Sequence, residues 1–328
     1  MPRALVTGIT GQDGWYLTEL LSNDGFDVYG LVTPGDPARV PPPATVVTGD
    51  LADGDSLARA VALAAPDEVY NLAGLSSVAE SWSLPERVAD INGVGVVRLL
   101  HALAAATRES APNGGGVRFV QASSAEIFAG SPPPHDERST VSPTTPYGAA
   151  KAFAHHCVGV YRSTGVGASS AILYNHESPR RPEHFVTRKI SRAVARIACG
   201  STDQLVLGNL DARRDWGHAR DYMRALTLMA RHRDPSDFVV ASGVSHSVED
   251  FVAEAFACIG VSDWQRHVRV DDTLARPSDA AEQRGNPAKA REVLGWQPEV
   301  SFEELVGEMV AADVAALQGS PQDFPRKP

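Results

Sequence analysis

The chain has 328 residues, enough for one large α/β unit or two cooperating domains. Its composition, 43% hydrophobic and 21% charged residues, is that of an ordinary globular protein in water. The net charge of −10 argues against a nucleic-acid partner, which usually meets a basic face, although a few local cations can still bind a small anionic ligand.

The first half of the chain alternates short apolar runs with amphipathic segments. We expect strands at residues 3–8, 26–32, 44–51, 68–74, 117–124 and 167–175, and helices at residues 13–25, 55–66 and 88–107. This βαβ spacing predicts a doubly wound, Rossmann-type parallel sheet with helices on both faces. Its ligand crevice is expected at the carboxyl ends of the strands.

The pattern loosens after about residue 175 and ends in an amphipathic helix at residues 301–317. We therefore expect a dinucleotide-binding domain at residues 1–174, with a returning segment around 210–245. Residues 175–328 are expected to form mainly a smaller, mixed α/β substrate lobe that covers the crevice.

The three cysteines, Cys157, Cys199 and Cys258, have neither metal nor disulfide spacing. We expect small buried side chains in a reducing, cytoplasmic compartment, and no metal site. No apolar run is long enough to span a bilayer, and the N-terminus leads directly into a strand rather than a signal peptide, so no membrane association is expected.

Three glycines, Gly8, Gly11 and Gly14, follow the first strand and open the first helix. Glycine lets the backbone approach a pyrophosphate closely, and a helix N-terminus offers free N–H groups. The alternative is a tight turn that needs glycine for its conformation alone.

A second motif, "PYGAAK", places Tyr147 and Lys151 on one helical face, because they are four residues apart. A lysine ammonium beside a phenol lowers the phenol pKa, which would make Tyr147 a usable base. Upstream, Ser124 and Glu126 follow a predicted strand into the crevice. The alternatives are an exposed helix face for the pair, a helix cap for Ser124 and a solvated loop charge for Glu126.

Together with "YNLAG", these motifs resemble the extended short-chain dehydrogenase/reductase superfamily. The sequence resembles the GDP-mannose 4,6-dehydratase family still more closely, through "TGITGQDGWYL", "QASSAEIF", "NHESPRR", "LGNLDARRDWGHARDY" and "LGWQP" in the family's order. The similarity runs from about residue 3 to about residue 310. It implies a lyase that converts GDP-D-mannose to GDP-4-keto-6-deoxy-D-mannose by internal hydride transfer.

The resemblance implies four catalytic residues: Ser124, Glu126, Tyr147 and Lys151. Tyr147 would take the proton from the sugar O4 as hydride leaves C4, while Lys151 holds the phenolate and the nicotinamide ribose. Glu126 would remove the C5 proton and help to expel the C6 hydroxyl, before hydride returns to C6. This carboxylate favours a dehydratase over an epimerase or reductase, in which nothing is eliminated.

The resemblance also implies two binding sets. The cofactor-binding positions are Gly8, Thr10, Gly11, Gln12, Asp13, Gly14, Thr33, Arg39, Asp50, Leu51, Leu72, Ala73, Gly74, Tyr147, Lys151, His176 and Arg181. The positions for the sugar nucleotide are Ser77, Asn175, Thr187, Lys189, Arg214, Arg276 and Asp279. Arginine suits the second set because its planar fork matches phosphate oxygens.

Several positions depart from the family pattern. Thr33 and Pro34 stand where the family usually has paired arginines for a 2′-phosphate, so NADP is expected on family grounds with NAD as the alternative. In the family, the same loop supports a tetramer. Because the loop is altered here, we expect either a homodimer or a homotetramer. Ser124 replaces a threonine, Phe128 a tyrosine and Asp279 a glutamate, while Leu75, Ser77 and Glu80 change a segment near the hexose.

Three alternatives to a GDP-mannose dehydratase stay open at the level of sequence. One is a GDP-sugar epimerase or reductase on the same scaffold, and another is a 4,6-dehydratase of a different NDP-hexose. The third is a non-catalytic nucleotide-binding protein, although such a protein has no physical need for all four catalytic residues.

Overall fold

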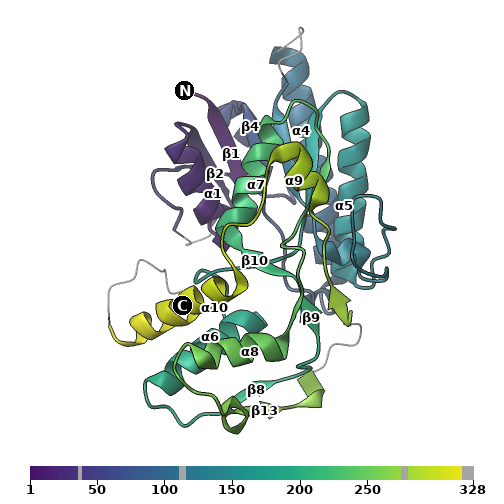
Figure 1. Ribbon diagram of the computed structural model, residues 1–328. Helices are drawn as coiled ribbons and strands as arrows, with labels where there is room; N and C mark the ends of the chain where they lie inside the picture. The colour runs from purple at the N-terminus through teal and green to yellow at the C-terminus, as the bar shows by residue number, and fades with distance from the viewer. Residues whose placement is uncertain (36–38, 111–115, 275–279, 320–328) are drawn as a thin grey trace.

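The computed structural model describes residues 1–35, 39–110, 116–274 and 280–319. Its larger part is a parallel sheet of seven strands (Figure 1). In spatial order these are β3 (Thr45–Thr48), β2 (Asp27–Val32), β1 (Arg3–Thr7), β4 (Glu68–Asn71), β5 (Arg118–Ala122), β6 (Gly167–Leu173) and β11 (Asp237–Val240). The order reverses between β1 and β4, which is where a doubly wound sheet opens its ligand crevice. The predicted fold is confirmed.

Helices cover both faces of this sheet because successive strand residues point to opposite sides. Val6 packs in one apolar cluster with α1 (Gln12–Asn23), α7 (Ala219–Arg231) and α9 (Ala288–Leu294). Leu5 packs in the other, with α2 (Gly54–Ala64), α4 (Gly95–Ser110) and α5 (Pro146–Ser163). Both clusters are buried, so the sheet has an apolar core on each of its faces.

The helix expected at residues 88–107 is a longer, composite element. It begins with α3 (Pro85–Ala89), passes through the π-helical turn η2 (Asp90–Val94) and continues as α4. By length and composition alone, the stretch Pro85–Ala106 is apolar enough to cross a membrane, so the expectation that no such run exists was wrong. Half of the stretch is buried inside the protein, where α4 packs against α2 and α5.

The second lobe is built on three helices and a small sheet, drawn in the lower part of Figure 1. Helices α6 (Val186–Ala198), α8 (Val248–Ala257) and α10 (Phe302–Leu317) enclose a third apolar cluster around Trp216. Strands β8 (Leu205–Leu207) and β13 (Val268–Val270) form a parallel pair beside them. Within the described residues, the short 3₁₀ turns are η1 (Glu80–Trp82), η3 (Ala125–Phe128), η4 (Trp264–His267) and η5 (Asp272–Leu274).

Short strands join the two lobes. β7 (Asn175–Glu177) pairs with β10 (Trp216–His218), and β9 (Arg213–Arg214) lies between β12 (His246–Ser247) and β14 (Glu282–Gln283). The chain therefore leaves the large sheet after β6, returns for α7 and β11, and returns once more for α9. The domain boundary at residue 174 stays a prediction, but β11 and α7 fall within the segment expected to return.

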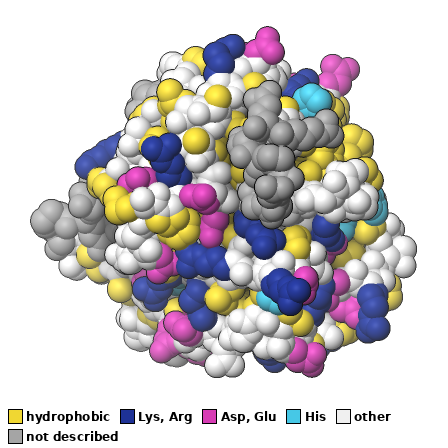
Figure 2. Space-filling model, turned by 90° about the horizontal axis from the view of Figure 1, so that it is seen from above, with side chains coloured by type: hydrophobic (Ala, Val, Ile, Leu, Met, Phe, Trp, Pro, Cys, Tyr) yellow, Lys and Arg dark blue, Asp and Glu magenta, His cyan; other side chains and the backbone are white. Residues whose placement is uncertain are grey.

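The cysteines and the charged surface residues differ in how far they match expectation. Cys199 and Cys258 are exposed and Cys157 is half-buried, so their expected burial was wrong; all three thiols are free. On the face seen in Figure 2, acidic and basic side chains are interspersed rather than gathered into a basic stripe.

Candidate active site

The turn between β1 and α1 is shaped by close backbone contacts. Gly8 has a φ of +67°, and a Cβ placed there would lie 2.7 Å from the amide nitrogen of Ala73. A Cβ on Gly14 would lie 2.3 Å from the carbonyl oxygen of Ile9. At Gly11, the N-cap of α1, no side chain of the described residues makes a capping hydrogen bond. The helix N-terminus therefore keeps backbone N–H donors for an anion, and this glycine cradle fits a pyrophosphate.

Asp13, in the first turn of α1, forms an ion pair with His176 of β7. The distance from His176 Nε2 to Asp13 Oδ2 is 2.9 Å, and the other ring nitrogen contacts the Tyr174 carbonyl oxygen. Burial opposes both charges, yet the pairing prevails: it raises the pKa of His176 and lowers the pKa of Asp13. Gln12 donates to the His176 carbonyl oxygen and accepts from Ser178. These predicted cofactor residues thus tie α1 to the second lobe.

The Tyr147–Lys151 pair lies on the buried face of α5, as predicted. Thr145 caps this helix by accepting a hydrogen bond from the Gly148 N–H, and Pro146 occupies its first turn. Lys151 Nζ lies 5.8 Å from the centre of the Tyr147 ring and donates to the Ala122 carbonyl oxygen at 2.8 Å. The ammonium is therefore held at the end of β5, beneath the crevice.

The proton affinities of this pair differ from the sequence prediction. Burial raises the pKa of Tyr147 to about 12, although a hydrogen bond with Ser124 acts in the opposite direction. Burial also lowers the pKa of Lys151 to about 8. The expected lowering of the Tyr147 pKa was wrong for the protein by itself, because removal from water outweighs the hydrogen bond with Ser124.

Ser124 and Glu126 lie at the end of β5, where the chain turns into η3. Ser124 Oγ accepts the backbone N–H of Glu126 at 3.2 Å, so this residue both caps η3 and contacts Tyr147. The Glu126 carboxylate is close enough to Tyr147 to raise its pKa. It also accepts a 2.8 Å hydrogen bond at Oε1 from the side chain of Gln283. The predicted catalytic residues are thus brought together.

The remaining predicted cofactor positions line the edge of the sheet. Leu72, Ala73 and Gly74 follow β4, and a Cβ on Gly74 would lie 2.8 Å from Asn92 Oδ1 and 3.8 Å from Lys151 Nζ. Others lie farther along the edge: Thr10 at the glycine turn, exposed Thr33 and Arg39 after β2, and Asp50 and buried Leu51 after β3. Arg181 forms an ion pair with Glu177 and stacks on the ring of Phe185.

The predicted substrate positions have different surroundings. Arg214 is buried on β9 and donates to the carbonyl oxygens of Arg213 and Ala280. Thr187 is fully buried and donates to Glu177, so its hydroxyl is already engaged. The others are Ser77, which accepts the Glu80 N–H, half-buried Asn175 and exposed Lys189. Arg276 and Asp279 lie outside the described residues.

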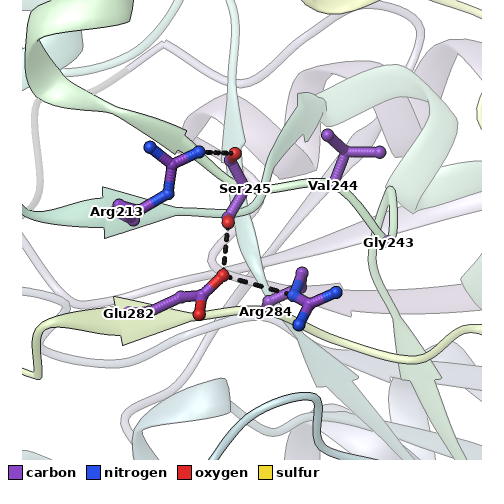
Figure 3. A pocket seen from close by; sticks show the side chains of 6 residues that line it. All are labelled: Arg213, Gly243, Val244, Ser245, Glu282 and Arg284. Atoms are coloured by element: carbon purple, nitrogen blue, oxygen red, sulfur yellow. Dashed lines mark hydrogen bonds and ion pairs between the residues drawn. The ribbon is translucent and has the colours of Figure 1, made fainter.

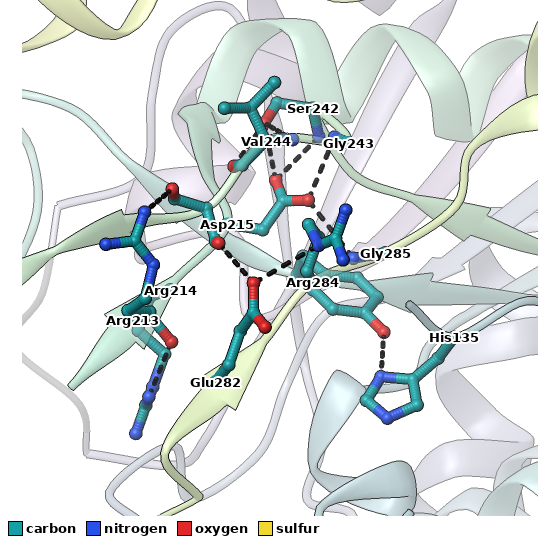
Figure 4. A network of polar contacts seen from close by, with 12 residues as sticks. His135, Arg213, Arg214, Asp215, Ser242, Gly243, Val244, Glu282, Arg284 and Gly285 are labelled. Carbon is teal, nitrogen blue, oxygen red and sulfur yellow. Dashed lines mark hydrogen bonds and ion pairs between the residues drawn. The ribbon is translucent and has the colours of Figure 1, made fainter. Parts of the chain in front are cut away.

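A polar network anchors the strands beside Arg214 (Figure 4). The carboxylate of Asp215 is fully buried and accepts four hydrogen bonds, two from Ser242 and one each from the N–H groups of Gly243 and Gly285. Burial raises the pKa of Asp215 despite these bonds. Asp215 thereby fixes the loop after β11 to the segment after β14.

Side chains alternate across β9 and β14. Arg214 and Gln283 are cross-strand neighbours, and Arg213 and Glu282 are the next pair. Arg213 and Glu282 line a separate cavity of about 380 Å³ together with Val244, Ser245 and Arg284 (Figure 3). Its charges are already matched, because Arg284 pairs with Glu282 and Arg213 with Asp250.

Two residues of the site escaped sequence reasoning. Asn92 lies in the π-helical turn η2 and bonds both backbone polar groups of Leu75, which fixes the segment after β4. Gln283 lies on a strand of two residues, too short for any periodic signal. The structure shows that the helix expected at residues 88–107 is interrupted by this π-helical turn, and such turns often mark functional sites.

Comparison with known proteins identifies similar chains. A family model described as GDP-mannose 4,6 dehydratase matches residues 5–309. GDP-mannose 4,6 dehydratase 1 of Arabidopsis thaliana is 43% identical, and the match covers 95% of this chain and 89% of the relative. The GDP-mannose 4,6 dehydratase of Homo sapiens is 40% identical, and the match covers 97% of this chain and 93% of the relative. Among solved structures, UDP-glucose 4-epimerase of Thermus thermophilus in complex with NAD superposes with a TM-score of 0.83 at 25% identity, covering 96% of this chain and 99% of that one.

Proposed function

The chain belongs to the GDP-mannose 4,6-dehydratase family, and we propose that Ser124, Glu126, Tyr147 and Lys151 carry out its reaction. The protein is an NDP-sugar 4,6-dehydratase, and the reaction is the 4,6-dehydration of GDP-mannose. The observation that supports the residue assignment is the meeting of one phenol, one hydroxyl and one carboxylate at the end of β5. An epimerase or reductase has no use for the carboxylate.

The protein uses a nicotinamide cofactor, and we infer that it binds across the glycine turn and the N-terminus of α1. The close contact of Gly8 with Ala73 and the uncapped end of α1 support this location. The solved epimerase of the same fold is a complex with NAD. We propose NADP on family grounds, with exposed Arg39 as the cation for its 2′-phosphate. When bound there, this group would supply the redox chemistry of the reaction, as a temporary store for the hydride that moves from C4 to C6 of the sugar.

Tyr147 is the base for the first step in this proposal. Its phenolate takes the proton of the sugar O4 hydroxyl, and Ser124 donates a hydrogen bond to the same oxygen. The Lys151 ammonium is held near the Tyr147 ring, because its Nζ donates a hydrogen bond to the Ala122 carbonyl oxygen. The phenolate of Tyr147 would be favoured further by the positive charge that an oxidised nicotinamide would supply.

Glu126 is the acid and base for the elimination. Once C4 is a ketone, the electrons of the C5–H bond can delocalise into the carbonyl, so the C5 proton becomes acidic. The carboxylate takes this proton, a C5–C6 double bond forms, and the C6–O bond breaks. The departing hydroxyl leaves as water with the proton that Glu126 carried. The carboxylate is thus regenerated before the last step. In that step C6 gains hydride and C5 gains a proton, the equivalent of the one that Tyr147 took from O4, which completes the 4-keto-6-deoxy product.

The sugar nucleotide is the substrate, and we propose that it spans from the crevice to β9. Arg214 and Lys189, with Arg276, supply cations for the diphosphate, while Asn175 and Ser77 supply hydrogen bonds. In this proposal Thr187 does not contact the sugar nucleotide directly. Its hydroxyl donates to the Glu177 carboxylate and so orients it. Asp279 is assigned to the ribose.

We propose a homodimer formed across α5, with a tetramer as the larger alternative. Phe153 and Val160 are large apolar side chains on the exposed face of α5, seven residues and two helical turns apart.

Free thiols on Cys199 and Cys258 at the surface favour a reducing compartment, and hence the cytoplasm.

The test is dehydration of GDP-mannose by the purified protein with NADP. Mass spectrometry of a panel of GDP-, UDP-, dTDP- and CDP-hexoses should show loss of one water, with GDP-mannose the preferred substrate. The Glu126→Gln variant should form the 4-keto product roughly 10²–10⁴-fold more slowly, because an amide cannot take the C5 proton. Glu292→Gln, an exposed carboxylate on α9, serves as the matched control. Full dehydration by Glu126→Gln would overturn the assignment.

A further inference from the structure

We propose that Gln283 positions the Glu126 carboxylate for the elimination, an inference that rests on the role of Glu126 proposed above. The amide nitrogen of Gln283 donates to Glu126 Oε1 at 2.8 Å. Gln283 is 3% exposed, so this amide faces little competition from water. The contact reaches from the second lobe to the end of β5, across 157 positions of the chain.

The backbone around Gln283 is held on both sides. The Asp215 N–H donates to the Gln283 carbonyl oxygen and the Arg213 N–H to that of Ala281, both at 2.9 Å. The carboxylate of Asp215 in turn accepts the Gly285 N–H. A strand of only two residues would otherwise be loosely held, but these bonds fix the position from which the amide reaches Glu126.

The chemistry of an amide suits this position. A carboxylate that accepts a hydrogen bond at Oε1 keeps Oε2 free for the C5 proton, so the contact selects which oxygen reacts. The amide group neither gains nor loses a proton at ordinary pH, so it does not compete in the transfer. Its hydrogen bond to the carboxylate prevents rotation of the Glu126 side chain away from the sugar.

The neighbouring residue provides a matched control. Glu282 lies beside Gln283 on β14, but it bonds Ser245 and Arg284 in the separate cavity of Figure 3. A change at Glu282 therefore alters the same strand without touching Glu126.

The experiment compares Gln283→Met, which keeps the length of the side chain and removes the donor, with Glu282→Gln. For Gln283→Met, kcat on GDP-mannose should fall roughly ten-fold or more, with KM unchanged, because a hydrogen bond to a charged group is lost. Single-turnover formation of the reduced cofactor, followed by its absorbance, should keep its wild-type rate. Incorporation of solvent deuterium at C5 should slow as much as kcat. Glu282→Gln should match the wild type in all three.

Other outcomes contradict the proposal. An unchanged kcat in Gln283→Met, or equal slowing of C4 oxidation and C5 exchange, would assign Gln283 a merely structural role. Gln283→Leu provides a second donor-free variant should the methionine variant not fold. If the wild-type protein itself released no 4-keto product, the proposed function would fail, which is a distinct result.

Discussion

Burial sets the proton chemistry of Tyr147 and Lys151. With the pKa of the phenol at about 12 and that of the ammonium at about 8, the dominant form near neutral pH carries a proton on each group. The reactive form, phenolate beside ammonium, has one proton fewer. It holds the same number of protons as the form with neutral tyrosine and neutral lysine, so the two share one pH dependence.

This proton count predicts the pH profile of the enzyme. The population of the reactive form rises about ten-fold per pH unit until Lys151 begins to lose its proton, and then stays level. At saturating cofactor, we therefore expect kcat/KM to rise with pH and to level off near pH 8, where Lys151 loses its proton. The plateau can begin at a lower pH, because the positive charge of an oxidised nicotinamide lowers the pKa of the phenol. In Lys151→Met the rise should continue above pH 8. A plateau at the wild-type position in that variant would contradict the account.

Some residue-scale properties could be predicted from the sequence and others could not. The four-residue spacing of Tyr147 and Lys151 determines that they share a helical face, and the structure places both side chains on it. Their pKa directions depend on burial against distant segments, such as Val88 of α3 beside Tyr147 and the end of β5 beside Lys151, which no local pattern reports. The Asp13–His176 pair joins positions 163 residues apart, so each residue alone gave no hint of the other.

At the scale of elements, the approach of α1 to β1 depends on Gly14. A Cβ there would lie 2.3 Å from Ile9 O and 2.4 Å from Ile9 Cα. Both are backbone atoms, which cannot rotate away as a flexible side chain could. The helix N-terminus therefore stays close to the sheet only with glycine at this position.

Gly14→Ala should consequently push α1 outward. We expect the free energy of unfolding to fall by roughly 1–3 kcal/mol, as for other overpacked sites, and the affinity for NADP to weaken. Gly307→Ala, in the middle of α10 with no atom within 4 Å of the new Cβ, should instead stabilise the protein by about 0.5–1 kcal/mol. Urea denaturation and fluorescence titration with NADPH measure both effects. A neutral Gly14→Ala variant would show that α1 can shift without cost.

Element positions were largely predictable because the hydrophobic period is a local property. The six strands expected in the first half correspond to β1 to β6, and the last helix corresponds to α10. The strands are shorter than expected: β5 ends at Ala122, which leaves Ser124 and Glu126 in the turn that reaches the crevice. β9, β12 and β14 have two residues each and form only through pairing with distant segments, so they left no signal.

For the molecule as a whole, Asp215 is the junction between the lobes. Its carboxylate holds Ser242 and Gly243 after β11 and Gly285 after β14. Four donors converge on two oxygens that are removed from water. Loss of this acceptor would leave buried N–H groups without partners, which is costly.

We therefore expect Asp215→Asn to destabilise the protein strongly although the side chain keeps its shape. The amide nitrogen would face an N–H donor, and the free energy of unfolding should fall by roughly 3 kcal/mol. Asp211→Asn, an exposed change on the same segment, should stay within about 0.5 kcal/mol of the wild type. Chemical denaturation of both variants is the measurement. Equal stability of the two would mean that the network contributes little.

The repeated return of the chain to the large sheet also affects its synthesis. β6 stays an edge strand until β11, at residues 237–240, pairs with it, and α1 lacks α7 on its outer face until residue 231 has been made. A nascent chain of only the first 174 residues thus exposes unpaired backbone and an apolar helix face to water. The nascent chain must be protected from aggregation over that interval, and shortening the protein to its first half would make the same exposure permanent.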